Sequence, residues 1–146
     1  MTGEMTKAEE DIRWILNQKA GYEPTEGFTA KSMVSVLARM GHKVPEGEGG
    51  TPIFVVSTEY GEFGAYAILH KDVQKTIQKV LGHKKFYVMP SSIHEILCTP
   101  MDGVEPGDLL RIVKMVNATE VEEAEQLMDA LFYYDGEHLQ YAAVEV

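Results

Sequence analysis

The sequence has little of what secreted and membrane-spanning proteins need. Its 146 residues include one cysteine, Cys98, so no disulfide can form within the chain, and a reducing, cytoplasmic location is expected. No apolar run approaches the ~20 residues that a membrane helix requires. The opening residues, MTGEMTKAEED, contain no apolar core of the signal-peptide kind. With 45% hydrophobic residues, the chain is expected to form one globular domain over residues 1–146.

Positive charge is also scarce. The chain carries 13 lysine and arginine residues against 23 aspartate and glutamate residues, which gives a formal net charge of -10. A surface of this sign repels phosphate backbones, so direct nucleic-acid binding is not expected. Lysines cluster between residues 71 and 85, but no aromatic residues alternate with them as a base-stacking platform would require. The composition therefore favours a protein partner, of basic character, over a nucleic acid or a membrane.

Carboxylates concentrate in the last third of the chain. After Met101 the only lysine or arginine residues are Arg111 and Lys114. One interpretation is a pair of solvated helix faces. The other is an acidic surface that meets a basic protein or occupies a basic nucleic-acid-binding groove. For that second interpretation the candidate binding residues are five carboxylates and two neighbouring tyrosines: Glu120, Glu122, Glu123, Glu125, Asp129, Tyr133 and Tyr134.

Helix signals recur along the chain. The capping-box spacing of Thr6 and Glu9 predicts a helix that begins near Thr6 and stops at Gly21. Apolar residues at helical spacing predict a second helix from Thr29 to Gly41, followed by a glycine-rich loop. Three later residues predict the starts of further helices. Asp72 is a cap residue for a helix that ends at Gly82, Pro106 suits the first turn of the next helix, and Thr119 caps the one after it.

Alternating or β-branched apolar runs predict the strands. They are expected at residues 53–57, 63–69, 86–89 and 93–98, with a C-terminal hairpin around Asp135-Gly136. The first two runs are expected to form a hairpin of their own. Short turns between neighbouring strands favour an antiparallel sheet, so the predicted fold class is α+β, with helices packed on one face. An unpaired edge strand near the C-terminal hairpin would allow a homodimer.

The segment FYVMPSSIHEILCTP carries the most distinctive residues. His94 and Glu95 match the first two positions of the zinc-protease motif H-E-x-x-H, but the fifth position is Cys98. On a strand, residues four apart are separated by about 13 Å, too far to share a zinc ion with bonds of about 2 Å. The glycine-rich stretch 47–50 precedes a strand and includes a carboxylate, which argues against a phosphate cradle. We therefore expect neither a metal nor another cofactor.

The same segment leaves a hydrolase open. Ser92 could supply a nucleophile with His94 as its base and Glu95 beside it. The alternative is a turn in which the proline fixes φ and the serine hydroxyls bind nearby backbone groups. Because no complete catalytic set is present, the leading interpretation is a non-enzymatic protein-binding or regulatory domain. A phage counter-defence protein that occupies a nucleic-acid-binding groove is one alternative, and a small hydrolase is the other.

Several segments of the second half carry a family resemblance. The core is P-S-S-x-H-E at residues 90–95, accompanied by Gly64-Ala65, Ile68-Leu69, Val113, residues 116–121 and Tyr134-Asp135. Over residues 64–134 the chain resembles an uncharacterised bacterial family, one of the domains of unknown function, found mostly in gut-dwelling anaerobes. The resemblance implies a bacterial or phage cytosolic origin and no assigned activity. Members of that family tend to have a longer N-terminal part, so the resemblance leaves two expectations open, a clipped paralogue or a mobile-element version.

Overall fold

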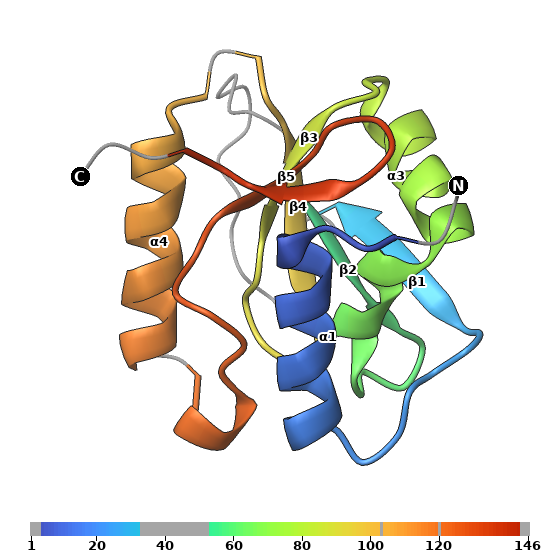
Figure 1. The fold of residues 1–146 in the computed structure, drawn as a ribbon, viewed down its shortest axis with the longest axis vertical. Helices are drawn as coiled ribbons and strands as arrows, with labels where there is room; N and C mark the ends of the chain where they lie inside the picture. Colours follow the sequence, from blue (N-terminus) through green and yellow to red (C-terminus); the bar gives the residue numbers. More distant parts are fainter. Residues whose placement is uncertain (1–3, 33–52, 103, 120, 144–146) are drawn as a thin grey trace.

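A six-stranded antiparallel sheet forms the centre of the fold (Figure 1). The computed structural model describes residues 4–32, 53–102, 104–119 and 121–143. The strand order is β1-β2-β4-β3-β5-β6, and every neighbouring pair is antiparallel. The strands are β1 (Phe28–Ser32), β2 (Phe54–Thr58), β3 (Phe86–Met89), β4 (Ile96–Pro100), β5 (Phe132–Tyr134) and β6 (Leu139–Tyr141). The predicted α+β class with an antiparallel sheet is confirmed.

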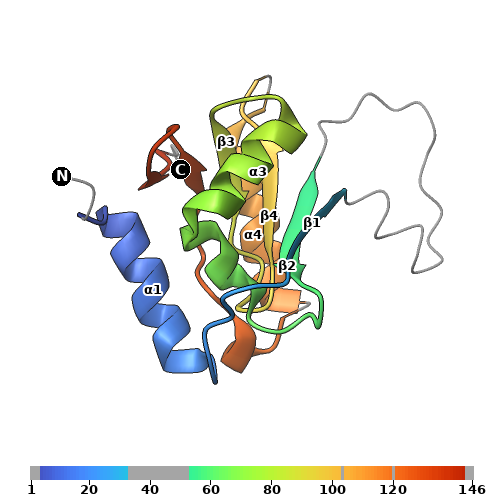
Figure 2. The same ribbon diagram turned by 90° about the vertical axis from the view of Figure 1, so that its right-hand side faces the viewer.

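Helices lie on both faces of this sheet (Figures 1 and 2). Their bounds are α1 (Lys7–Lys19), the 3-10 helix η1 (Gly64–Leu69), α3 (Lys71–Leu81), α4 (Pro106–Thr119) and the 3-10 turn η2 (Glu123–Glu125). Alternate side chains of β3 show the division, because Phe86 and Val88 pack with α1, η1 and α3, whereas Tyr87 and Met89 pack with α4. The sequence-based expectation covered one face, and α4 adds a cover to the second.

Local signals predicted several element ends correctly. The Thr6 hydroxyl accepts the Glu9 N–H at 3.2 Å, and the Glu9 carboxylate accepts the Thr6 N–H at 2.9 Å, which is the predicted capping box. Gly82, with φ of 73°, ends α3. The β5–β6 hairpin forms around Asp135, although its loop spans residues 135–138 instead of two residues. The Asp135 carboxylate holds that loop by accepting two backbone N–H groups at 2.8 Å.

Two predicted elements in the first half of the chain are wrong. The sequence predicts a helix from Thr29, but residues 28–32 form β1, because pairing with β2 supplies backbone partners that outweigh the helical spacing. Residues 33–41 and the glycine-rich stretch 47–50 lie outside the described residues. The strand expected at 63–69 is η1, so the expected hairpin is absent, and β2 pairs with β1 and β4. Residues 64–68 are all buried, so the alternation of side chains in this segment does not reflect one buried and one exposed face of a strand.

The helix predicted after α4 is also wrong, since only η2 forms within the described part of that segment. Side chains take the carbonyls that a longer helix would use. The Lys19 ammonium donates to the carbonyl oxygens of Glu123 at 3.1 Å and Gln126 at 2.7 Å. Asp72, expected to cap α3, lies in its first turn instead, and the N-cap position belongs to His70, which makes no side-chain capping bond.

Candidate functional site

The family motif at residues 90–95 forms a bend between β3 and β4. The strand predicted at 93–98 begins only at Ile96 and continues to Pro100. Ser92 causes the delay, because its N–H donates to the Glu95 carbonyl at 3.0 Å and its hydroxyl accepts the His94 N–H at 3.0 Å. The bonds that join Ser92, His94 and Glu95 are therefore those of a backbone turn.

Both ring nitrogens of His94 are engaged. Nδ1 accepts the Phe63 N–H at 3.0 Å, and Nε2 lies 3.3 Å from the Glu125 carboxylate. These partners select the neutral tautomer that carries its proton on Nε2. The Phe63 ring stacks on the imidazole with 5.2 Å between centroids. Phe63 has φ of 54°, a left-handed conformation uncommon for a residue with a side chain, and these contacts hold it there.

Gly64 brings η1 against the same bend. A Cβ at this position would lie 2.4 Å from the Ser57 Cα and 2.5 Å from the His94 carbonyl oxygen, so only glycine fits. The Gly64 N–H donates to that carbonyl at 3.0 Å, and the Ser57 hydroxyl donates to it at 2.7 Å. Two parts of the family pattern that lie far apart in the chain, Gly64 and His94, thus meet directly.

The bend supports two tyrosines on neighbouring loops. Tyr22 packs edge-on against Phe63 at 5.0 Å, and its hydroxyl donates to the Glu62 carboxylate at 3.0 Å. That hydrogen bond raises the pKa of Tyr22. The Thr58 hydroxyl closes the turn after β2, since it accepts the Glu62 N–H and donates to the Glu62 carbonyl, each at 3.0 Å. The closed turn presents Tyr60, which is 86% exposed.

Between these loops lies a hollow of about 270 Å³, which we call the tyrosine groove. Two exposed tyrosines are among its lining residues, and Pro24 and Thr58 are its buried members. Its lining comprises Tyr22, Glu23, Pro24, Thr25, Glu26, Thr58 and Tyr60. None of these described lining residues is a lysine, arginine or histidine. The signal in the sequence is local: Tyr22 follows Gly21 and Tyr60 precedes Gly61, so both aromatic residues fall in turns.

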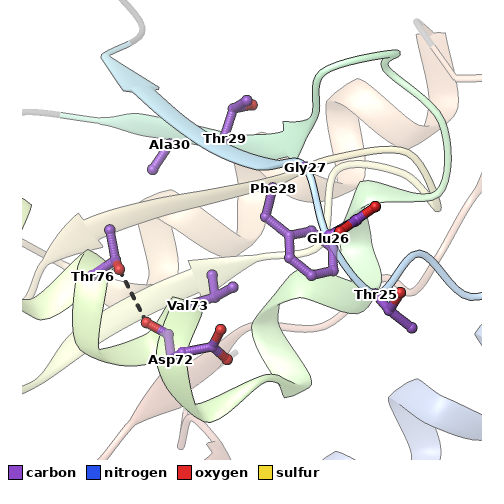
Figure 3. Close-up of a pocket in the computed structure, with 9 residues that line it drawn as sticks. All are labelled: Thr25, Glu26, Gly27, Phe28, Thr29, Ala30, Asp72, Val73 and Thr76. Carbon is purple, nitrogen blue, oxygen red and sulfur yellow. Dashed lines mark hydrogen bonds between the residues drawn. The ribbon is translucent and has the colours of Figure 1, made fainter.

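A second hollow, of about 340 Å³, lies between α3 and the stretch of residues 25–30 that leads into β1. We call it the strand hollow. Figure 3 shows Phe28 of β1 and Val73 of α3 pointing toward one another inside it. Its carboxylates are Glu26 and Asp72, and three threonines complete its polar lining. The two hollows share Thr25 and Glu26, so they lie next to one another, and each has carboxylates in its lining.

The carboxylates predicted as binding residues have separate environments. Glu122, just before η2, and Glu123, its first residue, are exposed. Glu125 is half-exposed and pairs with the imidazole described above. Asp129 is exposed, and its carboxylate accepts a side-chain amide N–H at 2.8 Å. Glu120 lies outside the described residues. Glu122 is the N-cap of η2 and Glu123 and Glu125 belong to it, so these three carboxylates lie on one turn.

The two predicted tyrosines of β5 do not form an exposed pair. Tyr134 is 3% exposed and stacks on Phe86 at 5.2 Å, so its side chain belongs to the core. Burial raises the pKa of Tyr134 accordingly. Tyr133 is half-buried and packs with the cluster under α4. The cause is topological, because β5 lies between β3 and β6 and both of its faces are covered.

These loops gather at one end of the sheet, the lower end in Figure 1. β2 ends there at Thr58, β4 begins there at Ile96 and β1 begins there at Phe28. We call this the acidic end, and its carboxylates are Glu23, Glu26, Glu59, Glu62, Glu122, Glu123 and Glu125. Arg13 pairs with Glu23 at 2.8 Å. The opposite end, where β3 begins, mixes the lysines that follow α3 with carboxylates such as Asp102.

Candidate metal ligands from the family motif lie in different surroundings. Cys98 is fully buried in the core, where burial raises the pKa of its thiol, whereas His94 is bonded at the acidic end. Among the described residues, no group of three or more His, Cys, Asp or Glu side chains could hold a metal ion. In the same part of the chain, no helix has both the length and the apolar content to cross a membrane.

A family of unknown function, DUF5688, matches residues 13–136. The chain belongs to this family. The resemblance to a domain of unknown function is thereby confirmed, and the match extends beyond residues 64–134 to take in the tyrosine groove. In this DUF5688 chain, His94 of the P-S-S-x-H-E core contacts Phe63, which in turn packs against Tyr22 of that groove. Neither the search of curated proteins nor the search of solved structures found a match.

Proposed function

We propose that the domain is a protein-binding module whose acidic end docks a basic protein partner. One observation carries the proposal: carboxylates and exposed tyrosines gather at one end of the sheet, where two hollows contain no positively charged residue among their described lining. Tyrosine is enriched at protein interfaces because one side chain offers both an apolar ring and a hydrogen-bonding hydroxyl. The surrounding carboxylates supply charge complementarity, which speeds encounter and excludes acidic competitors.

The bonding of the family motif supports a binding role over a hydrolytic one. A serine nucleophile needs a base whose free nitrogen faces the hydroxyl. Here the Ser92 hydroxyl accepts a backbone N–H, and both nitrogens of His94 have other partners, Phe63 and Glu125. The segment therefore acts as a support behind the binding surface.

A counter-defence role is the second candidate, and the net charge of -10 favours it. In that case the basic partner is a nucleic-acid-binding protein, and the acidic end occupies the channel that its nucleic acid would use. The observation that separates this role from the first is competition. A DNA or RNA duplex would displace the domain from such a partner, and would leave it bound to a partner that has no nucleic-acid channel.

Site-specific photo-crosslinking tests the docking surface. A photoreactive residue replaces exposed Ala124 on η2 in one variant, and exposed Lys79 on α3 in the matched control. We expect a defined protein to crosslink in native cells from position 124 and not from position 79. The purified complex should then weaken as NaCl rises from about 0.05 M to about 0.5 M, because screening shortens the reach of the carboxylates. Equal crosslinking from both positions, or salt-independent binding, would contradict the proposal.

A further inference from the structure

The tyrosine groove has the dimensions of a single side chain. Its volume is about 270 Å³ and it lies next to the strand hollow, so it can take one extended side chain of a longer segment. Its lining includes two aromatic residues, Tyr22 and Tyr60, which are 53% and 86% exposed. We propose that this groove binds one lysine or arginine side chain of the partner, an inference that rests on the proposed function and names its central contact.

Charge selects a cation as the occupant. The face of a tyrosine ring attracts a cation held within about 6 Å of its centroid. Glu26 is exposed at the point where the groove meets the strand hollow, and nothing of opposite charge among the described lining residues competes for it. Glu62 adds a second carboxylate beside Tyr22, and a guanidinium can bind a carboxylate through two parallel N–H bonds.

The groove is already formed before a partner arrives. Thr58 locks the turn that carries Tyr60, and Glu62 and Phe63 hold Tyr22 from two sides. Behind them, His94 fixes Phe63 through its N–H and its ring. Such preorganisation improves affinity because little side-chain freedom is lost on binding. His94 is therefore a positioning residue, and the P-S-S-x-H-E core serves the groove without touching its occupant.

The strand hollow gives the bound chain a direction. Glu26 lines both hollows, so a segment whose cation enters the tyrosine groove passes next over Phe28 and Val73 (Figure 3). Asp72 lines the far side of this second hollow. A second basic residue close to the first in the partner would therefore meet another carboxylate. The best ligand is a short segment with two closely spaced arginine or lysine residues.

A pair of synthetic peptides tests the charge requirement. The probe is N-acetyl-Gly-Arg-Gly-Arg-Gly-amide, and its control carries citrulline in place of both arginines, which keeps the shape and removes the charge. Both are titrated into the full-length ¹⁵N-labelled protein and followed by amide chemical shifts. We expect the arginine peptide to shift the amides of Gly27 and Gly61, which lie beside the groove, and the citrulline peptide to leave them in place. Equal binding of the two peptides, or shifts confined to other surfaces, would overturn the inference.

Substitutions then test the individual walls. Tyr60→Ala and Glu26→Gln should each weaken arginine-peptide binding roughly two- to fivefold, the range of an exposed cation–π or ion-pair contact. The matched controls are Ile112→Ala on α4 and Asp102→Asn after β4, both exposed and away from the groove, and they should leave binding unchanged. Both groove substitutions remove exposed side chains, so the fold should persist. Unaltered affinity in Tyr60→Ala would exclude the groove as the binding site.

The two proposals fail in distinguishable ways. If the arginine peptide fails to bind the unsubstituted protein while the Ala124 crosslink to the partner forms and survives in Tyr60→Ala, the groove inference is wrong and the docking surface stands. If the peptide binds in the groove and no protein crosslinks from position 124, the docking surface is wrong. A concentration-dependent dimer that Tyr60→Ala abolishes would replace the separate partner with a second copy of the chain.

Discussion

Gly64→Ala is the sharpest test of how the family motif packs. The added Cβ would lie 2.4 Å and 2.7 Å from backbone atoms of Ser57 and 2.5 Å from the His94 carbonyl oxygen. All three neighbours are backbone atoms, so relief requires η1 to move away from β2 and the bend. Overpacking of this kind costs about 1–3 kcal/mol.

The movement also breaks hydrogen bonds that converge on the His94 carbonyl. The Gly64 N–H and the Ser57 hydroxyl donate to it at 3.0 Å and 2.7 Å. Each bond contributes about 0.5–1.5 kcal/mol, whereas the stiffer alanine recovers about 0.4–1 kcal/mol by restricting the unfolded chain. We therefore expect Gly64→Ala to lower the free energy of unfolding by about 3 kcal/mol.

Gly21→Ala is the matched control. Its Cβ would lie 3.7 Å from the Phe63 ring, an ordinary contact, so the free energy of unfolding should stay within about 1 kcal/mol of the parent value. Urea denaturation followed by far-UV circular dichroism measures both variants, with unchanged m-values expected. A loss below about 1 kcal/mol in Gly64→Ala, or equal losses in the two variants, would refute the close approach described here.

Three further substitutions probe other contacts. His94→Ala leaves the Phe63 N–H without its acceptor and should lower the free energy of unfolding by about 2 kcal/mol in urea denaturation. His94→Asn should lose less, because its Oδ1 can replace Nδ1 as the acceptor. Equal losses in the two variants would contradict the acceptor role. Glu9→Gln should cost about 1–3 kcal/mol by the same measurement, because both oxygens of this buried carboxylate accept backbone N–H groups, and the exposed Glu10→Gln should cost nothing. Burial raises the pKa of the Cys98 thiol, so the free energy of unfolding should fall by up to about 1.4 kcal/mol per pH unit above about pH 8.5, where the thiol ionises in the unfolded chain. Cys98→Ala should lack this alkaline loss of stability. Identical pH profiles of the two proteins would contradict the burial of the thiol.

Elements with local causes could be predicted from the sequence. The Thr6–Glu9 capping box, the end of α3 at Gly82 and the hairpin around Asp135 each depend on a few neighbouring residues. β1 and η1 could not be predicted in this way. Residues 28–32 are extended because β2 pairs with them, and η1 coils because Gly64 admits backbone contact with the bend at His94.

The candidate site, too, has one part that the sequence indicates and another that depends on distant contacts. Its supporting residue, His94, stands out in the sequence, but its partners Phe63 and Glu125 are each 31 residues away in the chain. The tyrosine groove joins residues 22–26 to residues 58–60 through the pairing of β1 with β2, which the sequence did not predict. Once that pairing is known, the exposed tyrosines and their carboxylates follow from the turns that carry them.

The uneven distribution of charge between the two ends of the sheet has a kinetic consequence. Among the described residues, one end carries mostly carboxylates and the other mixes both signs, so these charges are separated along the direction of the strands. If the proposed basic partner carries many positive charges, its field would exert a torque that turns the tyrosine groove toward it before the surfaces touch. Fewer collisions are then wasted on wrong orientations, an advantage that salt removes once the Debye length shrinks to about 8 Å or less.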